Sequence, residues 1–351
     1  MKSQAIVTYG EALEETTTDT PAPQGKEVLV KVSHCGVCHS DVHLHDGYFD
    51  MGGGNKLDVR GGRQLPFTLG HEIEGVVEAV GPDVDGIKPG DHYVVYPWIG
   101  CGECAICERG DEHLCLRPRA LGINVAGGYA THVMVPDQKY LLDRTGVPDG
   151  LAATYMCSGL TAYSALKKLG NPGPEDKVVI VGCGGVGMMG IQFARALLPS
   201  APLAADVDEG KLQAAKGAGA DAVYNPKDEN AIKQLMADTG GGAYAAIDFV
   251  GSEASMKFAT SVVRKGGQVV VVGLFGGGFS MPIPMFPMRA ITIGGSYVGS
   301  PQEAADMMEL VRAGKVDPIP VEERPLDAAS KSLDDLRRAI GETHKFVKIA
   351  P

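Results

Sequence analysis

Several features are missing from this sequence of 351 residues. It contains no run of about 18 consecutive apolar residues, so we expect no membrane span. Residues 1–13 lack the apolar core of a secretion signal, which predicts a cytoplasmic location. There is no cluster of basic side chains, and the net charge of −11 repels a phosphate polyanion. We therefore expect neither nucleic acid nor a membrane as a partner.

A single domain is also not expected, because chains beyond about 250–300 residues usually divide. In the first part of the chain, glycine and proline separate short strand-like runs at 27–38, 75–81 and 91–97. Helical periodicity is scarce there, which indicates a β-rich domain with irregular connections. Helices are expected again at 301–313 and 327–340. The strand-like run that follows them, 344–350, suits a return to this first domain.

From residue 171 onward, short apolar strands alternate with helical segments. This alternation is typical of a parallel, doubly wound α/β sheet, and unbroken apolar runs are typical of its buried strands. We predict a β-rich domain from 1–158 with 297–351, and a Rossmann-type domain from 159–296. The expected strands are 177–182, 202–206, 222–225, 245–251, 268–273 and 290–296, with helices at 186–198, 209–219, 231–237 and from Glu253.

A glycine-rich G-x-G-x-x-G pattern follows the strand 177–182 and opens the next helix. In this context the glycines allow a tight turn and a close backbone approach to a pyrophosphate, which the helix N-terminus attracts. Asp206 ends the next strand, where a carboxylate accepts from both ribose hydroxyls of NAD and repels the 2′-phosphate of NADP; Lys211 lies nearby. A glycine-rich turn with a solvated aspartate is the alternative. The predicted NAD contacts are Gly182, Gly184, Gly185, Val186, Gly187, Asp206 and Lys211.

Eight cysteines need an explanation, and four of them follow C-x2-C-x2-C-x7-C. In a reducing compartment such clustering favours metal over disulfides. Four thiolates so close in sequence suit a closed tetrahedral zinc. An iron–sulfur cluster is the rival, but its cysteine run is typically followed by proline, and Leu116 follows here. Four free surface thiols would be open to oxidation. The predicted structural zinc ligands are Cys101, Cys104, Cys107 and Cys115.

Two further segments, CGVCHSDVH at 35–43 and GHEIEG at 70–75, lie close in sequence. Taken alone, Cys35 and Cys38 could form a redox dithiol, but the early βαβ unit of a thioredoxin is missing and a histidine follows. Together with the four cysteines and the glycine-rich pattern, these segments occur in the order typical of one family. The chain resembles the zinc-dependent alcohol dehydrogenases of the medium-chain dehydrogenase/reductase family over nearly its whole length. The resemblance implies a GroES-like catalytic domain beside the Rossmann domain.

The resemblance also implies a catalytic zinc, so that the chain would carry two zinc ions. Its matching ligands are Cys38, His71 and Cys157, which leave a fourth position for water or substrate. Glu72 matches a carboxylate that lies behind the metal and can exchange in as a ligand. Asp41 matches a carboxylate that orients the ligand histidine and fixes its tautomer.

Other residues match the family's substrate and cofactor contacts. Ser40 matches the hydroxyl that touches the substrate oxygen, and His43 matches the far end of a proton relay through the nicotinamide ribose. His39 corresponds to a residue near the pyrophosphate, and Thr161 to one that packs against the nicotinamide. Lys345 either replaces a pyrophosphate arginine or is a solvated lysine.

The implied activity is the reversible, NAD-dependent oxidation of an alcohol to an aldehyde or ketone, in a homodimer or homotetramer. A polyol dehydrogenase is one rival, but such members often have glutamate where Cys157 stands. A zinc-free reductase would lack the three ligands together, and a non-catalytic nucleotide-binding protein is the third rival. The sequence departs from shorter members in a glycine-rich link at 48–66, interpreted as a structureless loop that covers the substrate cleft.

Overall fold

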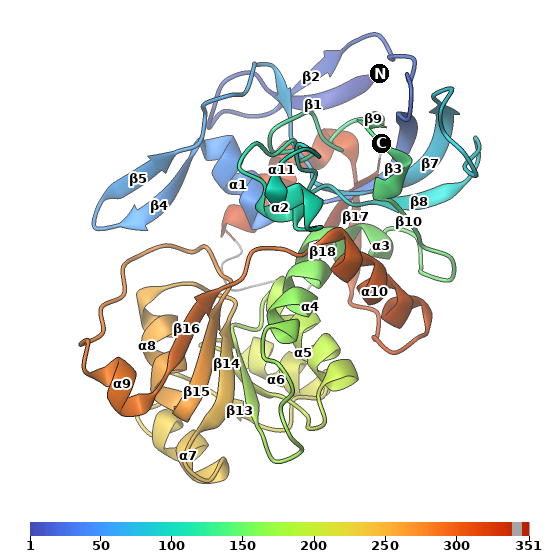
Figure 1. Cartoon of the computed structure of the whole chain (residues 1–351). Helices are drawn as coiled ribbons and strands as arrows, with labels where there is room; N and C mark the ends of the chain where they lie inside the picture. Colours follow the sequence, from blue (N-terminus) through green and yellow to red (C-terminus); the bar gives the residue numbers. More distant parts are fainter. Residues whose placement is uncertain (339–345, 351) are drawn as a thin grey trace. The chain divides into compact units, whose positions relative to one another are not determined.

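The computed structural model describes residues 1–338 and, as backbone, residues 346–350. The chain divides into two compact units (Figure 1). Unit 1 comprises Met1–Tyr48, Asp58–Leu160 and Gly299–Pro351, and unit 2 comprises Phe49–Leu57 and Thr161–Val298. The assignment of Phe49–Leu57 to unit 2 is a feature that the sequence did not indicate.

Unit 1 is built on a seven-stranded sheet with the order β10-β8-β7-β3-β18-β17, and β9 also pairs with β3. Glycine and proline break the chain into these short strands, and apolar residues such as Val30 and Val77 pair across β3 and β7 in the core. A smaller sheet has the order β2-β1-β6. The strands are β1 (Lys2–Ile6), β2 (Glu14–Thr17), β3 (Val28–Gly36), β6 (Phe67–Thr68), β7 (Glu72–Val80), β8 (His92–Val95), β9 (His132–Val135), β10 (Leu141–Asp143), β17 (Val321–Pro325) and β18 (Phe346–Ala350).

The strand-like run expected near the end of the chain forms β18, which lies in the sheet of unit 1. Strand β18 pairs antiparallel with β3 and parallel with β17, so the sheet of unit 1 combines early and late parts of the sequence. Short helices connect its strands: α1 (His39–Asp46), α2 (Ala105–Glu108), α3 (Leu151–Thr154), α10 (Pro301–Arg312) and α11 (Ala329–Arg338), with 3-10 turns η1 (Glu112–Leu114), η2 (Gln138–Tyr140) and η4 (Leu326–Ala328) and a π-turn η3 (Tyr155–Gly159).

Unit 2 contains a six-stranded sheet with the order β13-β12-β11-β14-β15-β16. Every adjacent pair is parallel, which confirms the predicted doubly wound sheet. The strand order reverses beside β11, and such a switch point is where open α/β sheets bind ligands. The strands are β11 (Val178–Val181), β12 (Leu203–Ala205), β13 (Val223–Tyr224), β14 (Ala243–Asp248), β15 (Val263–Val271) and β16 (Thr292–Gly295). The helices are α4 (Leu160–Lys167), α5 (Gly185–Leu197), α6 (Glu209–Gly217), α7 (Ala231–Asp238), α8 (Glu253–Val262) and α9 (Met285–Arg289).

The expectation of a structureless link at 48–66 is wrong for its first half. Residues 48–58 form a two-stranded hairpin of β4 (Tyr48–Gly52) and β5 (Asn55–Asp58). Gly53 and Gly54 supply the left-handed backbone, φ 60° and 80°, that a tight turn requires. The hairpin lies against the loop at Gly277, whose Cα would be 2.7 Å from a Cβ added at Gly52. The glycines therefore build a turn and a close backbone contact.

In the described part of the chain, none of the helices has the length and apolar character needed to cross a bilayer.

Candidate metal and nucleotide sites

Three side chains from separate segments of unit 1 meet at one point. The ligand atoms of Cys38, His71 and Cys157 all lie within 4.8 Å of one another, and the two sulfur atoms are 3.8 Å apart. Cys38 caps the N-terminus of α1, His71 directly precedes β7, and Cys157 lies in the π-turn η3. We call these residues the three-ligand cluster. The structure thus brings together the three residues predicted as catalytic zinc ligands.

The imidazole of His71 indicates that this cluster fits a metal ion. Its Nε2 is buried and has no hydrogen-bond partner. An unsatisfied buried polar atom costs about 1–3 kcal/mol, so a native protein rarely leaves one without purpose. Two cysteine sulfurs and one imidazole are ligands that zinc prefers, and three of them leave a fourth position open.

The Cys38 thiol is poised to be a thiolate. Its pKa lies well below the ordinary value because Cys157 donates to it, and His71 adds to this effect, against the opposing effect of burial. The N-terminus of α1 also favours a negative charge at this position. A thiolate is the form of cysteine that binds metal.

The carboxylate of Asp41 contacts two of the three residues of the cluster. Its Oδ1 lies 3.2 Å from His71 Nδ1 and accepts from the Gly70 amide at 3.3 Å. Its Oδ2 accepts from the Cys38 amide at 3.1 Å and from the Tyr129 hydroxyl at 3.0 Å. Because Nδ1 is engaged in this way, Nε2 is the nitrogen left for a metal. This geometry matches the orienting role that the resemblance implied for Asp41.

Glu72 lies beside the cluster in a buried position. The Ser158 hydroxyl donates to its Oε1 at 3.1 Å, while Oε2 is buried without a partner. Burial raises the pKa of Glu72 to about 8, and the nearby Cys38 thiolate adds to the increase. The carboxylate packs so closely on β3 that a Cβ at Gly36 would lie 1.8 Å from its Oε2. Glycine is therefore required at residue 36.

Helix α1 carries the predicted substrate-side residues. Ser40 and His43 are three residues apart and so lie on one face of the helix, and both are half-buried. Burial lowers the pKa of His43, and the neighbouring charge of His39 lowers it further. His39 itself is exposed. His45, further along the helix, is buried, with Nε2 2.6 Å from the Glu11 carbonyl oxygen.

The four-cysteine segment folds into a second cluster, which we call the cysteine lobe (residues 101–115). The sulfur atoms of Cys101, Cys104, Cys107 and Cys115 lie within 4.8 Å of one another, and three pairs are 3.5, 3.8 and 4.0 Å apart. A tetrahedral zinc with Zn–S bonds of about 2.3 Å requires sulfur atoms about 3.8 Å apart. Backbone amides of Cys101 and Arg117 donate to the Cys115 sulfur at 3.3 Å each. The lobe therefore fits a closed zinc site.

Sequence reasoning missed residues that support both clusters. Glu112 is buried and accepts from Tyr140 at 2.5 Å and Lys139 at 2.7 Å, which ties the cysteine lobe to the segment before β10. Tyr129 and Glu74 are also buried in unit 1. Glu74 could have been noticed in the sequence, because it lies within a strand that contains several apolar residues. A charged side chain that is buried in such a strand usually has a partner.

Trp98 contacts the three-ligand cluster. Its indole Nε1 donates to the Met156 carbonyl at 2.7 Å, and its ring lies 5.3 Å from the His71 ring, centroid to centroid. Trp98 is buried, so it packs in the core beside His71 rather than lining an open pocket.

The glycine-rich pattern in unit 2 has the geometry of a phosphate-binding turn. Gly182 has φ 90°, and a Cβ at Gly187 would lie 1.8 Å from the Gly182 carbonyl oxygen, so helix and strand touch there. A Cβ at Gly184 would meet no protein atom within 4 Å. Gly185 and Val186 begin α5, whose N-terminus has no side-chain cap. Open space beside free amides at a helix N-terminus is the arrangement that a pyrophosphate requires.

Asp206 follows β12 at the edge of this turn. Its Oδ2 accepts from the Cys183 amide at 2.7 Å, and its Oδ1 accepts from the Asp208 amide at 3.0 Å. Lys211 lies in the first turn of α6, and Thr161 lies in the first turn of α4. Lys345 lies outside the described residues. Cys183 and Cys35 are fully buried.

Comparison with known proteins matches both parts of the chain to described families. Residues 24–148 match the family described as the GroES-like domain of alcohol dehydrogenases, and residues 185–313 match the family described as zinc-binding dehydrogenase. The fold and the family-level matches thus define a zinc-binding dehydrogenase with a GroES-like domain.

Similar proteins of known name narrow this class. The chain is 39% identical to the NAD-dependent alcohol dehydrogenase of Sulfurisphaera tokodaii over 345 residues, which cover 97% of this chain and 98% of the relative. It is 38% identical to the enzyme of the same name from Saccharolobus solfataricus, at the same coverage. The crystal structure of the Aeropyrum pernix alcohol dehydrogenase superposes with a TM-score of 0.88 at 30% identity, covering all of both chains. This chain belongs to the family of zinc-dependent, medium-chain alcohol dehydrogenases.

Proposed function

We propose that this protein oxidises an alcohol to an aldehyde or ketone, reversibly, with transfer of a hydride to NAD. The observation that carries the proposal is the three-ligand cluster, in which the Nε2 of His71 is buried and unpartnered and two cysteine sulfurs lie close by. Zinc held there would supply a Lewis acid that lowers the pKa of an alcohol. The family membership supports the same chemistry.

The residues of α1 and β7 have distinct tasks in this proposal. Ser40 would take the hydroxyl proton of the alcohol and release its own, and His43, one turn further, would be neutral because of its lowered pKa and so able to accept a proton. Asp41 would keep His71 in the tautomer that points Nε2 at the cluster. Glu72 would offer a carboxylate behind the cluster, able to enter as a further ligand. A zinc in the cysteine lobe, the second per chain, would be structural because all four positions are filled by protein.

The preference for NAD over NADP rests on Asp206. Its carboxylate is held by two backbone amides at the end of β12, where it would accept from the ribose hydroxyls and repel a 2′-phosphate. The nearby Lys211 reduces this repulsion in part. Gly182, Gly184, Gly185, Val186 and Gly187 would receive the pyrophosphate. His39 and Thr161 are the further cofactor contacts that the family pattern implies.

A single experiment tests the proposal. Zinc content and NADH formation are measured on the purified protein with linear, aromatic and cyclic alcohols, each with NAD and with NADP. We expect two zinc ions per chain and NAD-dependent turnover that is lost on chelation. One tightly held zinc and no turnover with any alcohol would leave only the cysteine lobe established.

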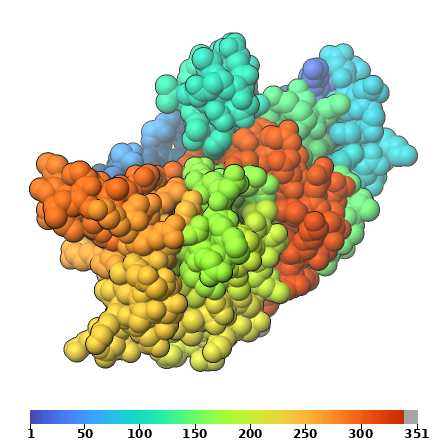
Figure 2. Space-filling view, turned by 60° about the horizontal axis from the view of Figure 1, so that its bottom comes forward, coloured from blue at the N-terminus to red at the C-terminus, as the bar shows by residue number. Residues whose placement is uncertain are grey.

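We also propose that the protein is a homodimer or homotetramer in the cytoplasm. A segment around β16 exposes large apolar side chains, and it forms the orange lobe at the left of Figure 2. Such a patch is typical of an interface between subunits. The free thiols of all eight cysteines suit a reducing compartment. The exposed side chains are Leu274, Phe275, Ile283, Phe286, Met288 and Tyr297.

A further inference from the structure

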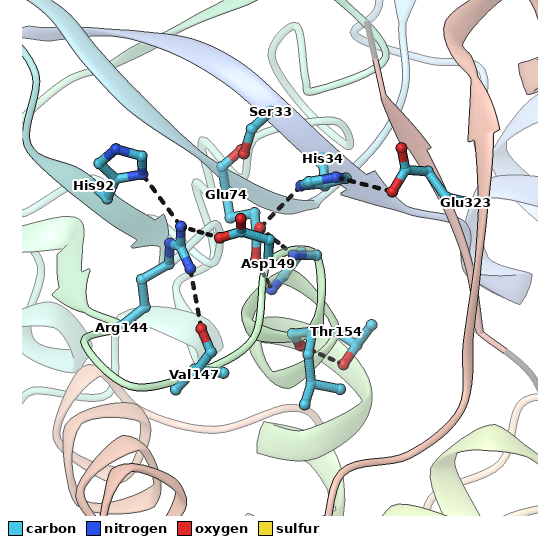
Figure 3. A network of polar contacts seen from close by, with 12 residues as sticks. Ser33, His34, Glu74, His92, Arg144, Val147, Asp149, Thr154 and Glu323 are labelled. Atoms are coloured by element: carbon cyan, nitrogen blue, oxygen red, sulfur yellow. Dashed lines mark hydrogen bonds and ion pairs between the residues drawn. The ribbon is translucent and has the colours of Figure 1, made fainter.

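Glu74 is a fully buried carboxylate near the start of β7 (Figure 3). Its Oε2 accepts from the Ala153 amide at 3.0 Å, and its Oε1 accepts from the Gly150 amide. His34 Nδ1 lies 3.0 Å from the same Oε1. A buried carboxylate needs such donors, because desolvating a charge without partners costs several kcal/mol.

The two amides belong to the start of α3. The residue before this helix is Gly150, which has a left-handed backbone and offers no side chain to cap the free amides. Glu74 therefore takes the place of the missing cap, with its negative charge at the positive end of the helix. Because α3 continues directly into the π-turn η3, this contact fixes the start of the segment that carries Cys157.

Strand β7 holds the same segment at a second place. Glu72 lies two residues before Glu74, so both side chains leave the strand on one side, and Glu72 accepts from the Ser158 hydroxyl at 3.1 Å. Cys157 thus lies between Ala153, which donates to Glu74, and Ser158, which donates to Glu72. Both carboxylates belong to β7. His71 directly precedes that strand.

We propose that Glu74 is a positioning residue for the three-ligand cluster, which sets the place of Cys157 relative to His71. His71 directly precedes β7, and through Glu74 the same strand holds the helical segment that carries Cys157. The inference rests on the proposed function, because it requires that the cluster binds the catalytic zinc.

Neighbouring groups support the position of Glu74. His34 lies between two carboxylates, since its Nε2 is 3.4 Å from the exposed Glu323 on β17. The loop before α3 is held separately, because Arg144 donates to Asp149 at 2.6 Å and to the Val147 carbonyl at 3.2 Å (Figure 3). The loop therefore retains its own anchor when Glu74 is changed, which makes a substitution at residue 74 a local test.

The test compares Glu74→Gln with Asp248→Asn. Glutamine keeps the shape of the side chain but replaces one carboxylate oxygen by an NH2 group, which donates. At least one partner that donates to Glu74, such as the amide of Gly150 or Ala153, therefore loses its acceptor. Asp248 in unit 2 is the matched control: it is fully buried and accepts from the amides of Val250 and Gly251 and from the Ser255 hydroxyl. Both variants should lower the melting temperature.

Two readouts separate positioning from stability. The holoenzymes are exposed to a chelator, and cobalt is exchanged into the catalytic site to record its visible absorption without NAD. For Glu74→Gln we expect about tenfold faster loss of one metal ion per chain and a shifted cobalt spectrum, as outer-shell changes typically produce. For Asp248→Asn we expect the wild-type rate and spectrum. Glu74→Asp, which keeps the charge but is shorter by one methylene, should fold and give an intermediate shift in the same direction.

The outcomes distinguish the inference from the proposed function. If Glu74→Gln and Glu74→Asp melt at lower temperature but keep the wild-type metal-loss rate and cobalt spectrum, Glu74 only stabilises the fold and the inference is overturned. If the wild-type protein itself takes up no cobalt outside the cysteine lobe, the proposed function fails first.

Discussion

Asp41 is the residue on which most of the geometry around the three-ligand cluster depends. Its two oxygens contact His71, Gly70, Cys38 and Tyr129, and it is fully buried. Two of these contacts involve predicted zinc ligands themselves. A change at residue 41 therefore acts on the metal without removing a ligand.

We expect Asp41→Asn to weaken zinc binding at the three-ligand cluster by about 10–100-fold, because the imidazole of His71 loses its charged partner. Zinc per chain is measured after dialysis against a graded series of chelator concentrations. The matched variant Tyr129→Phe removes one donor and leaves the carboxylate, so its effect should be smaller. Equal zinc retention in wild type and Asp41→Asn would contradict this role.

At the scale of single residues, Gly184 offers a second test. A Cβ there meets no protein atom within 4 Å, and its backbone φ of −75° suits alanine. We expect Gly184→Ala to melt at the wild-type temperature but to bind NADH about tenfold more weakly, because the methyl group occupies the space of the pyrophosphate. Gly187→Ala, where the Cβ would lie 1.8 Å from Gly182 O, should instead lower the melting temperature as well. Unchanged NADH affinity by fluorescence titration in Gly184→Ala would argue against a pyrophosphate at this turn.

At the scale of elements, the parallel sheet of unit 2 was predictable and most of unit 1 was not. Strands such as β11 are fully buried, so their sequences are unbroken apolar runs, which can be recognised without the structure. The glycine-rich turn is equally local, since its residues are consecutive. Such local patterns can be recognised from the sequence because they do not depend on residues far apart in the chain.

Helix α1 shows why the catalytic region was harder to predict. Its sequence, HSDVHLHD, has little apolar periodicity, and its ends are set by Asp41 at the N-terminus and by Gly47, with φ 83°, at the C-terminus. The π-turn around Cys157 has no sequence signature either. The contacts that hold both elements join residues far apart in the chain, as Tyr129 with Asp41 and Ala153 with Glu74. The resemblance to a family indicated that Asp41 and Cys157 belong to one site, but it indicated neither Tyr129 nor Glu74.

The cysteine lobe is an element that metal should stabilise. Apart from its four sulfurs, it has short helical turns and few apolar side chains. We expect Cys104→Ser to lose one zinc ion per chain and to lower the melting temperature, because structural zinc contributes folding free energy directly. The cobalt spectrum of the three-ligand cluster should stay unchanged. A shifted spectrum would mean that the two metal sites are not independent.

At the scale of the whole molecule, the patch near β16 should govern assembly. Ile283 is 82% exposed and apolar, so its replacement by aspartate should not disturb the folded subunit. We expect Ile283→Asp to shift the protein to a smaller species in light scattering after size-exclusion chromatography. Leu116, which is 87% exposed on the cysteine lobe, provides the control variant Leu116→Asp. An unchanged mass for Ile283→Asp, with a wild-type oligomer, would place the interface elsewhere.

The position of β18 has a consequence for how the protein is made. Unit 2 is almost continuous in sequence, whereas the sheet of unit 1 needs β17 and β18, from residues 321–350, beside β3 from residues 28–36. On a ribosome, the nucleotide-binding unit therefore emerges complete while the other sheet still lacks two strands. During that interval Cys38 and His71 are already synthesised while the sheet that positions them is incomplete, so the Cys38 thiol is open to oxidants.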